Sequence, residues 1–521
     1  MKIITVILFF VLASCIAVGF ILKPDDLEII EGRPNIVLFL ADDLGYGDVN
    51  WNNSKAVIET PHLDNLAKQG VILTDCYSSS SMCSFSRAGL LTGRSPMRIG
   101  IHDWIKEIYN KPLSNIHLPD SETTIPELLR ANGYQTAVIG KWHLNNGFRT
   151  GNKSDPDHHG FNYWFCTPVQ ADPSHKNPTN FYDNGEALGQ IGTEEHPQFS
   201  SGIVADKTMA WLDKRNRNKP FFIYIPFHEP HVVCDAPDEI KEKYLNRISN
   251  GEIPLIEGTG ADGLGMAEYF ASVENMDIAI GRIMKKLASE ELLDNTFILF
   301  TSDNGPDSNR KYKGRLQSVG ETGEFRGRKR WLLEGGIRQA SIVYWNNKVK
   351  AGSSISTPIG HVDLLPTLCE IAGVNVPNDR TVDGISLVSN LKGEATERKG
   401  NPLHWHFYSP RGDSPQSVLR SGKWIITANW DMPRPKGRFN LSAIENIKRA
   451  NLIDFKLYNI EDDHEQLNDM KELHPDIHKN LIKQLIEIHK SVKEECPGKD
   501  NFVWNNHLQN IVDKNFSHLK E

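Results

Sequence analysis

The sequence contains no pair of cysteines spaced as CxxC, although it has seven cysteines in all. A zinc framework and a dense disulfide scaffold are therefore both disfavoured. The chain also lacks a GxSxG elbow, a Walker loop and an HExxH helix, so serine-hydrolase, NTPase and zincin functions lose support. Acidic residues outnumber basic ones, 66 to 58, whereas a dedicated nucleic-acid binder is normally basic, so we expect no nucleic-acid partner.

The N-terminus carries a long apolar run. Residues 3–22 are apolar apart from Thr5 and Ser14, and Lys2 precedes them. This pattern predicts a secretory signal peptide over residues 1–22. A retained membrane anchor is one alternative, because the run is long enough to cross a bilayer. A lipoprotein box at Leu12–Cys15 is another, although the apolar run continues past Cys15. All three interpretations predict that the rest of the chain is secreted, periplasmic or lysosomal, and sequons for N-glycosylation agree with this, at Asn52, Asn152, Asn440 and Asn515.

Short apolar runs in the first 310 residues predict buried parallel strands, at Asn35–Leu40, Thr136–Ile139, Phe221–Pro226 and Thr296–Phe300. Helix-like stretches lie between them, such as Thr124–Ala131 and Ala267–Ala288. Continuous apolar strands that alternate with helices are typical of an α/β fold whose sheet is covered on both faces. We therefore predict a large, mostly parallel sheet in a catalytic domain spanning residues 23–395.

The pattern changes after the polar, Pro- and Gly-bearing stretch Ser389–Pro402. Short strand-like segments follow without intervening helices, at Leu403–Tyr408, Lys423–Ala428 and Lys456–Ile460, and then an amphipathic stretch at Pro475–Glu494. This predicts a smaller C-terminal α+β subdomain over residues 396–521, formed by a short antiparallel sheet and a helix.

Two of the predicted strands run into acidic or amide side chains. Asp42 and Asp43 follow the first strand, and Asp303 and Asn304 follow the last. Ligands of open α/β sheets bind beyond the carboxyl ends of the strands. Carboxylate and amide oxygens suit calcium or magnesium better than zinc. Either pair alone is commonly a helix cap or a turn, but two pairs at equivalent strand ends favour a shared metal.

A further segment reads Cys83-Ser84-Phe85-Ser86-Arg87, followed by Thr92-Gly93-Arg94. A cysteine entering a helix lies where the helix dipole favours an anion, and Arg87 lies one turn further on. Here the sequence resembles the sulfatase family, whose signature is C-x-P-S-R, a short spacer and T-G-R; Phe85 stands where the family has proline. Further blocks match in the family's order, at Asn35–Asp48, Gly140–His143, His228–His231, Asp303–Pro306, Arg326–Lys329 and Glu334–Arg338.

The resemblance implies a chemistry and a role for each matching residue. Cys83 is expected to be oxidised by a formylglycine-generating enzyme, and its hydrated aldehyde is expected to attack sulfur and later release sulfate. Calcium is expected to be bound by Asp42, Asp43, Asp303, Asn304 and the modified Cys83. Arg87 is expected to hold the hydrated aldehyde, and Lys141 and Lys329 are expected to bind the sulfate. His143 is expected to act as the base, and His228 to protonate the leaving oxygen.

The substrate implied is a sulfated carbohydrate or an aryl sulfate. Two alternatives stay open: a phosphodiesterase or phosphonate hydrolase of the same superfamily, and a catalytically silent glycan-binding protein in which Cys83 remains a thiol. From their positions relative to the motifs, we expect three segments to line the pocket mouth, at Asp172–Thr179, Lys311–Gly323 and His404–Tyr408. Asp303→Ala is expected to abolish turnover and leave the fold largely intact.

Overall fold

The computed structural model describes residues 32–497 except 103–104, 106–116, 146, 149–153, 257–262, 309–310, 313, 395–397, 399, 411–413 and 433–440. The predicted signal peptide and the sequons at Asn152, Asn440 and Asn515 lie outside the described residues. Within the described part of the chain, no helix is long and apolar enough to cross a membrane.

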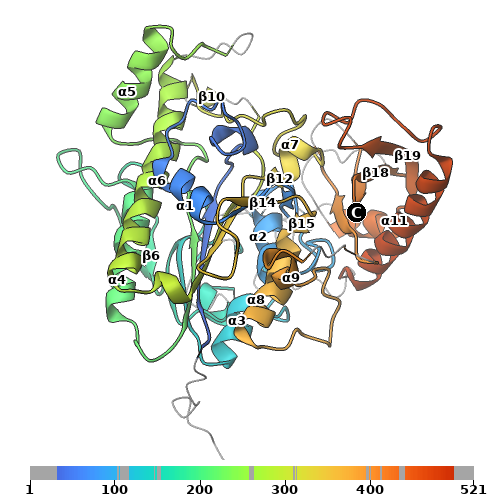
Figure 1. Ribbon diagram of the computed structural model, residues 1–521, viewed down its shortest axis with the longest axis horizontal. Helices are drawn as coiled ribbons and strands as arrows, with labels where there is room; N and C mark the ends of the chain where they lie inside the picture. The colour runs from blue at the N-terminus through green and yellow to red at the C-terminus, as the bar shows by residue number, and fades with distance from the viewer. Residues whose placement is uncertain are drawn as a thin grey trace, which may run out of the picture. The chain divides into compact units, whose positions relative to one another are not determined.

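A ten-stranded sheet forms the centre of the fold, in the order β14-β2-β13-β9-β1-β8-β4-β5-β6-β7 (Figure 1). Its five central strands run parallel: β9 (Thr296–Ser302), β1 (Asn35–Ala41), β8 (Phe221–Pro226), β4 (Gln135–Lys141) and β5 (Tyr163–Thr167). The flanking strands are β14 (Ser353–Ile355), β2 (Val71–Leu73), β13 (Ile342–Trp345), β6 (Tyr182–Asp183) and β7 (Glu186–Ala187). Antiparallel pairing enters at β13 on one side and at β6 on the other.

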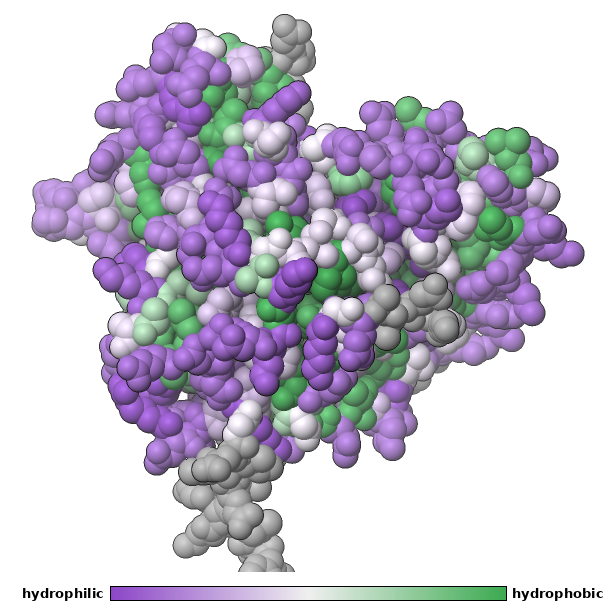
Figure 2. Space-filling view, viewed as in Figure 1, coloured by the Kyte–Doolittle hydropathy of each residue, from purple (hydrophilic) through white to green (hydrophobic). Residues whose placement is uncertain are grey.

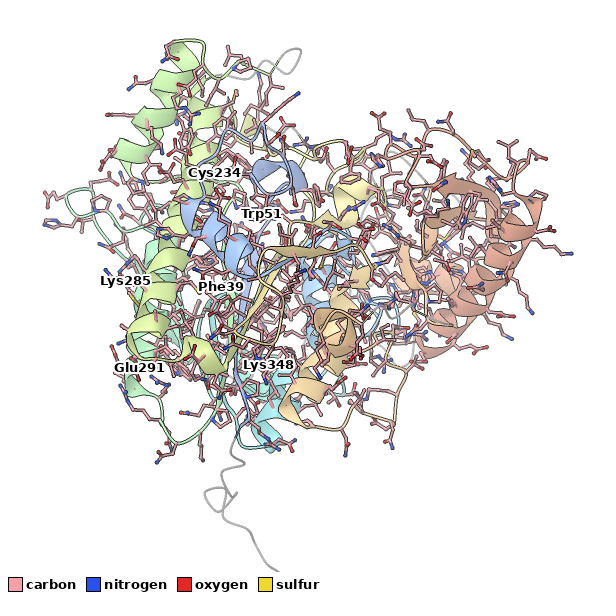
Figure 3. All side chains as sticks on the ribbon, viewed as in Figure 1. Phe39, Trp51, Cys234, Lys285, Glu291 and Lys348 are labelled. Carbon is pink, nitrogen blue, oxygen red and sulfur yellow. The ribbon has the colours of Figure 1, made fainter. Side chains whose placement is uncertain are left out.

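The central strands are mostly apolar and buried because both of their faces are covered. Along β1, Leu38 packs into one apolar cluster while Phe39 packs into the cluster on the opposite face. Figure 3 shows Phe39 inside the molecule and Lys285 of α6 at its edge, where that lysine is exposed. The predicted α/β architecture is confirmed.

Helices cover both faces of this sheet. One apolar cluster joins it to α1 (Pro61–Gln69), α4 (Ser200–Lys214), α5 (Asp238–Ser249) and α6 (Gly263–Ser289). The other joins it to α2 (Cys83–Thr92), α3 (Ile125–Ala131), α8 (Leu364–Ala372) and α9 (Val388–Leu391). In Figure 1 the green helices α4 and α6 lie on one side of the sheet and the orange α8 on the other.

Short elements complete the connections around the main sheet. They are η1 (Tyr46–Asp48), β3 (Cys76–Tyr77), η2 (Pro156–His159), η3 (Leu293–Asn295), β10 (Lys311–Tyr312), β11 (Arg315–Leu316), α7 (Glu334–Ile337), β12 (Arg338–Gln339), β15 (Ile359–Gly360) and η4 (His361–Asp363). The strands β12, β3 and β15 form a small sheet of their own, which ties the segment before Cys83 to the segment that follows Lys329.

The C-terminal part is a four-stranded antiparallel sheet, β16 (Leu403–Phe407), β17 (Gln416–Ser421), β18 (Trp424–Trp430) and β19 (Leu452–Asn459), with α10 (Leu441–Arg449) and α11 (Pro475–Glu495). Leu481 and Leu485 of α11 pack against β17, β18 and β19. The outer surface over α11 and α5 is predominantly hydrophilic (Figure 2), as expected for helices with one buried face. The antiparallel sheet and the long helix agree with the predicted α+β appendage, whereas the boundary at residue 396 stays a prediction.

Candidate active site

The two acidic strand ends meet because β1 and β9 are parallel neighbours in register, with Ala41 opposite Ser302. Asp42, Asp43, Asp303 and Asn304 therefore leave the sheet at the same edge, and each is at most 3% exposed. The backbone N–H of Asp43 donates to Asp303 Oδ1 at 3.2 Å. This close approach fixes the spacing of the two strand ends.

The cysteine sulfur and three carboxylates converge on one point. One ligand atom each from Asp42, Asp43, Asp303 and Cys83 lies within 4.8 Å of all the others. The Nδ2 group of Asn304 donates to Asp43 Oδ1 at 2.6 Å, whereas its Oδ1 atom is buried without a partner among the described residues. An unsatisfied amide oxygen beside three carboxylates is the donor set that a hard divalent cation requires, so the residues present fit calcium or magnesium.

Three buried cations face these three carboxylates. Arg87 contacts Asp303 Oδ2 through Nη2 at 2.7 Å and through Nε at 3.0 Å. Lys141 pairs with Asp42. Lys329 contacts both oxygens of Asp43, at 2.7 and 2.8 Å. The cluster is thus balanced in formal charge, which explains how six ionisable groups are buried together.

The same burial sets the protonation of the carboxylates. Burial raises the pKa of Asp43 to about 7, against the opposing charge of Lys329 and with a further contribution from Asp42. Burial alone would also raise the pKa of Asp42, but Lys141, His231 and Arg87 together hold it well below its usual value. The two neighbouring carboxylates therefore differ in their affinity for a proton, and Asp42 is the one that stays ionised.

Cys83 is the first residue of α2, and its Sγ lies 3.6 Å from Asp42 Oδ1. The thiol is 3% exposed, and burial raises its pKa well above the usual value despite the nearby lysines. A thiolate nucleophile is therefore disfavoured at this position. Arg87, one turn into the same helix, points back at the cluster, as the helix spacing predicts.

Two histidines have the same tautomer and the same vacant nitrogen. His143 Nε2 lies 2.7 Å from the carbonyl oxygen of Ile105, which only accepts, so Nε2 carries the hydrogen. His228 Nε2 lies 2.7 Å from Thr167 Oγ1, and the Thr167 hydroxyl itself donates to the carbonyl of Val169 at 2.6 Å. Nε2 of His228 therefore donates to Thr167. Both Nδ1 atoms are buried without a hydrogen-bond partner in the described structure.

The pKa of His143 and that of His228 lie well below the usual value. Burial is the main cause in both cases; Lys141 comes next for His143, and His175 and then Lys141 for His228. His231 has the opposite tautomer, because its Nδ1 donates to the carbonyl of Val232 at 2.6 Å. Its Nε2 lies 3.8 Å from Asp43 Oδ2.

A cavity of about 350 Å³ opens over this cluster. It is lined by Met82, Cys83, His143, Gln170, Ala171, Asp172, Pro173, His231, Val232, Val233, Asp307, Lys311, Lys329 and Arg330. Arg87, Lys141, His228 and four of the predicted metal ligands, Asp42, Asp43, Asp303 and Asn304, are not among the lining residues. All of these except Asp43 have no exposed surface.

The predicted mouth segments are only partly correct. Asp172 and Lys311 line the cavity. The segment His404–Tyr408 does not: Leu403–Phe407 forms β16, and its Trp405 is buried with Nε1 donating to the carbonyl of Ser78 at 2.8 Å. His231 and Arg330 line the cavity but were absent from the predicted catalytic set. For Arg330 the available signal was its place directly after Lys329.

A parallel sheet that gathers carboxylates and buried cations around a cysteine at the first position of a helix suits the hydrolysis of anionic esters. The chain belongs to the sulfatase family, because the family model described as Sulfatase matches residues 34–374. The protein is accordingly a sulfuric ester hydrolase.

Three relatives illustrate the match. Arylsulfatase A of Bos taurus is 33% identical over 412 residues, which cover 75% of this chain and 74% of that protein. N-acetylgalactosamine-6-sulfatase of Homo sapiens is 30% identical over 417 residues, 76% of this chain and 73% of that protein. The crystal structure of Ps i-CgsB has the same fold, with a TM-score of 0.71 at 24% identity over 94% of this chain and 99% of that chain.

Proposed function

We propose that the protein removes sulfate from a sulfated carbohydrate, with Cys83 converted to formylglycine and with one calcium ion held by Asp42, Asp43, Asp303 and Asn304. The observation that carries the proposal is the convergence of the carboxylate oxygens of Asp42, Asp43 and Asp303 on Cys83 Sγ. Beside them, the Oδ1 atom of Asn304 has no hydrogen-bond partner among the described residues. The match to N-acetylgalactosamine-6-sulfatase supports a sugar as the alcohol part of the ester.

The charges of the site favour an anionic ester. The three carboxylates face three cations, Arg87, Lys141 and Lys329, so a bound divalent ion leaves the pocket with two positive charges. When bound, calcium supplies positive charge beside the sulfate oxygens, where negative charge develops in the transition state. Lys329 is the cation of this set that reaches the cavity wall, so it is positioned to contact the sulfate directly.

The state of Cys83 decides between a hydrolase and a binding protein. A buried thiol with a raised pKa does not ionise at neutral pH, which argues against a role as a free thiol nucleophile. A hydrated aldehyde at this position supplies a neutral hydroxyl as the nucleophile and a second hydroxyl for the release of sulfate. Arg87, which lies one turn further along the helix, holds the oxygens at this position through its guanidinium.

The histidines contribute at a defined atom. With Nε2 committed to Thr167, His228 exchanges its proton with the ester only through Nδ1. Its low pKa means that the ring is neutral before substrate binds, and the negative charge of a sulfate ester favours uptake of the proton. His228 Nδ1 then donates to the leaving sugar oxygen, while His143 Nδ1 accepts a proton on the Cys83 side.

Three measurements on the purified protein test this function. Turnover is compared on nitrophenyl sulfate, sulfated N-acetylhexosamines and nitrophenyl phosphate, the state of Cys83 is read by mass spectrometry, and calcium is counted per chain. Cys83→Ala should lose essentially all turnover, while Cys369→Ala, a buried cysteine on α8, serves as the matched control.

We expect sulfate esters to be hydrolysed at least 100-fold faster than phosphate, with about one calcium per chain. Faster hydrolysis of phosphate or phosphonate esters would instead favour the hydrolases of those esters. An unmodified Cys83 in a protein that binds but does not hydrolyse sulfated glycans would favour the glycan-binding alternative.

A further inference from the structure

Three residues with unusual backbone conformations lie at the catalytic cavity or beside it: His143 and Arg330 line it, and Asp43 contacts the lining residue Lys329. Asp43 has φ = 68°, His143 has φ = 56° and Arg330 has φ = 76°. L-residues other than glycine rarely adopt this left-handed region, and such strain concentrates at functional sites. Across the described residues the other non-glycine cases are Asn177, Asn184, Glu291, Asn347, Asp454 and Gln466, of which four are Asn or Asp, the types that tolerate this region best.

Asp43 and His143 already have roles in the proposed chemistry, but Arg330 has none. Its backbone is clamped: its N–H donates to the carbonyl of Ser81 at 2.9 Å, just before Cys83, and the N–H of Trp331 donates to the carbonyl of Arg328 at 3.0 Å. This turn aims Lys329 at Asp43. Glycine at position 330 would form the same turn without strain, so the presence of arginine points to a use of its side chain.

The cations at the cavity mouth differ from those in the cluster beneath the cavity in whether they have a carboxylate partner. In the cluster, Arg87, Lys141 and Lys329 are each paired with a carboxylate. Arg330 and Lys311 also line the cavity, but within the described structure neither side chain has an ion pair or a hydrogen bond.

Two carboxylates line the same cavity. Asp307 accepts the backbone N–H of Ser308 at 2.8 Å. Burial by itself would lower the pKa of Lys329, but the charges of Asp43, Cys83 and then Asp307 raise it well above its usual value. Asp172 is exposed at the rim. The cations that line the cavity, Lys311, Lys329 and Arg330, therefore exceed its two lining carboxylates by one charge, which favours an anionic ligand.

We propose that Arg330, together with Lys311, forms a second anion subsite at the mouth of the catalytic cavity. It binds an additional acidic group, a sulfate or a carboxylate, on the saccharide whose ester sulfate lies at Cys83. The guanidinium suits such a group because its planar fork matches two oxygens at once. This inference rests on the proposed function and narrows its substrate to saccharides with at least two negative groups.

The test compares substrates that differ by one anion. A monosulfated N-acetylhexosamine, its disulfated counterpart and a monosulfated disaccharide with a uronate are measured against nitrophenyl sulfate. We expect kcat/KM to be at least tenfold higher for a substrate that carries a second anion. The ratio of kcat/KM for the disulfated saccharide to that for the uronate disaccharide identifies which second anion is preferred. Arg330→Gln should reduce this preference to less than threefold, a loss much larger than its effect on nitrophenyl sulfate.

Two further variants separate binding from structure. Arg330→Gly should lose the same preference yet be at least as thermostable as Arg330→Gln, because it relieves the left-handed strain. Arg217→Gln removes a side chain that is 64% exposed and does not line the cavity, so its preference should equal that of the wild type. Equal losses on all substrates in Arg330→Gln, or a wild type indifferent to the second anion, overturn the subsite.

A binding measurement makes the result independent of turnover. Calorimetric titration of the mono- and disulfated saccharides into the Cys83→Ala protein, with and without Arg330→Gln, gives the same comparison. If binding depends on Arg330 but no sulfate ester is ever hydrolysed, the subsite stands and the proposed function fails. If nitrophenyl sulfate is hydrolysed but the second anion does not affect affinity, the proposed function stands and the subsite fails.

Discussion

Asp303 allows the sharpest test of the buried charge cluster. It has no exposed surface, and Arg87 donates two hydrogen bonds to its Oδ2. In Asp303→Ala the guanidinium keeps only the carbonyl of Lys141 at 3.0 Å and Asp42 at 3.6 Å. Breaking a buried ion pair costs about 3–5 kcal/mol, and the remaining Asp42 contact puts this case near about 3 kcal/mol.

That loss is a large share of the about 5–15 kcal/mol by which folded proteins are stable. The expectation of an intact fold in Asp303→Ala is therefore revised: the variant should be inactive and also markedly less stable. Asp303→Asn is the matched control, because a neutral oxygen still accepts from Arg87, so its cost should be about 1.5 kcal/mol.

Guanidinium unfolding with a chelator, and again with calcium, measures both effects. Calcium at 100 times its Kd for the wild type should stabilise the wild type by about 2.7 kcal/mol. At the same calcium concentration this increment should shrink in both variants, because each lacks one of the proposed carboxylate ligands. An Asp303→Ala protein that unfolds at the wild-type midpoint would refute the pairing argument. A full calcium increment in Asp303→Asn would refute the ligand assignment.

Three further outcomes are expected. His228→Ala should slow the hydrolysis of sugar sulfates far more than that of nitrophenyl sulfate, because the nitrophenyl leaving group needs no proton. Thr167→Val should show part of the same difference between the two substrates, and Thr167→Ser should behave like the wild type. The kcat/KM values of each variant on both substrates measure this. Burial lowers the pKa of His489 to about 4, so the folded state resists its protonation, and stability should fall by up to about 3 kcal/mol as the pH drops from 6.5 to 4. His489→Asn should flatten this decline in urea midpoints. Phe85→Pro should raise the aldehyde fraction at Cys83, measured by mass spectrometry, at a cost in stability.

The sequence predicts that the two strand ends converge, because two buried apolar runs each end in oxygen ligands, Asp42 and Asp43 after the first and Asp303 and Asn304 after the second. It does not predict the order of the strands, because nothing local to residues 35–41 states that β9 is the neighbour of β1. The proton-bearing nitrogens of His143 and His228 depend on Ile105 and Thr167, which are distant in the chain and lie outside any motif.

The features that the sequence did not predict correctly have physical causes as well. The strand β17 (Gln416–Ser421) escaped prediction because polar Gln416, Arg420 and Ser421 break the apolar run. Arg420 is nevertheless buried, with only 4% of its surface exposed, because Asp75 of the main domain neutralises its charge. The position of His404–Tyr408 in the chain predicts a place at the pocket mouth, but the segment belongs to β16, whose Trp405 hydrogen-bonds to the carbonyl of Ser78 and attaches the C-terminal sheet.

The residue at position 85 affects both the proposed conversion of Cys83 and the packing of the folded protein. Under the proposed conversion of Cys83, the formylglycine-generating enzyme, here called the maturing enzyme, is expected to act on the peptide before the chain folds. Proline at position 85 would bias the preceding residue toward an extended form in that peptide. In the folded protein Phe85 is the third residue of α2, and the first helical bond runs from the Ser86 N–H to the Met82 carbonyl. A proline at position 85 therefore removes no helical hydrogen bond.

The folded state nevertheless uses the phenylalanine. Phe85 is 3% exposed, and its ring packs edge-on against that of Phe407 with the ring centroids 5.5 Å apart. This contact connects α2, the helix that begins at Cys83, to β16 of the C-terminal sheet. Replacing this ring by proline should cost about 2–3 kcal/mol, below the about 3–5 kcal/mol of a Phe→Ala truncation because the pyrrolidine ring fills part of the space.

Phe407→Ala separates these two demands. It removes the same ring contact without touching the segment that the maturing enzyme reads, so its stability should fall while the aldehyde fraction stays at the wild-type value. Phe85→Pro should lose stability and gain aldehyde, and its activity per aldehyde should equal that of the wild type. If Phe407→Ala also changes the aldehyde fraction, conversion depends on how fast the chain folds rather than on the peptide alone. In that case the substitution at position 85 reflects the packing of the C-terminal sheet.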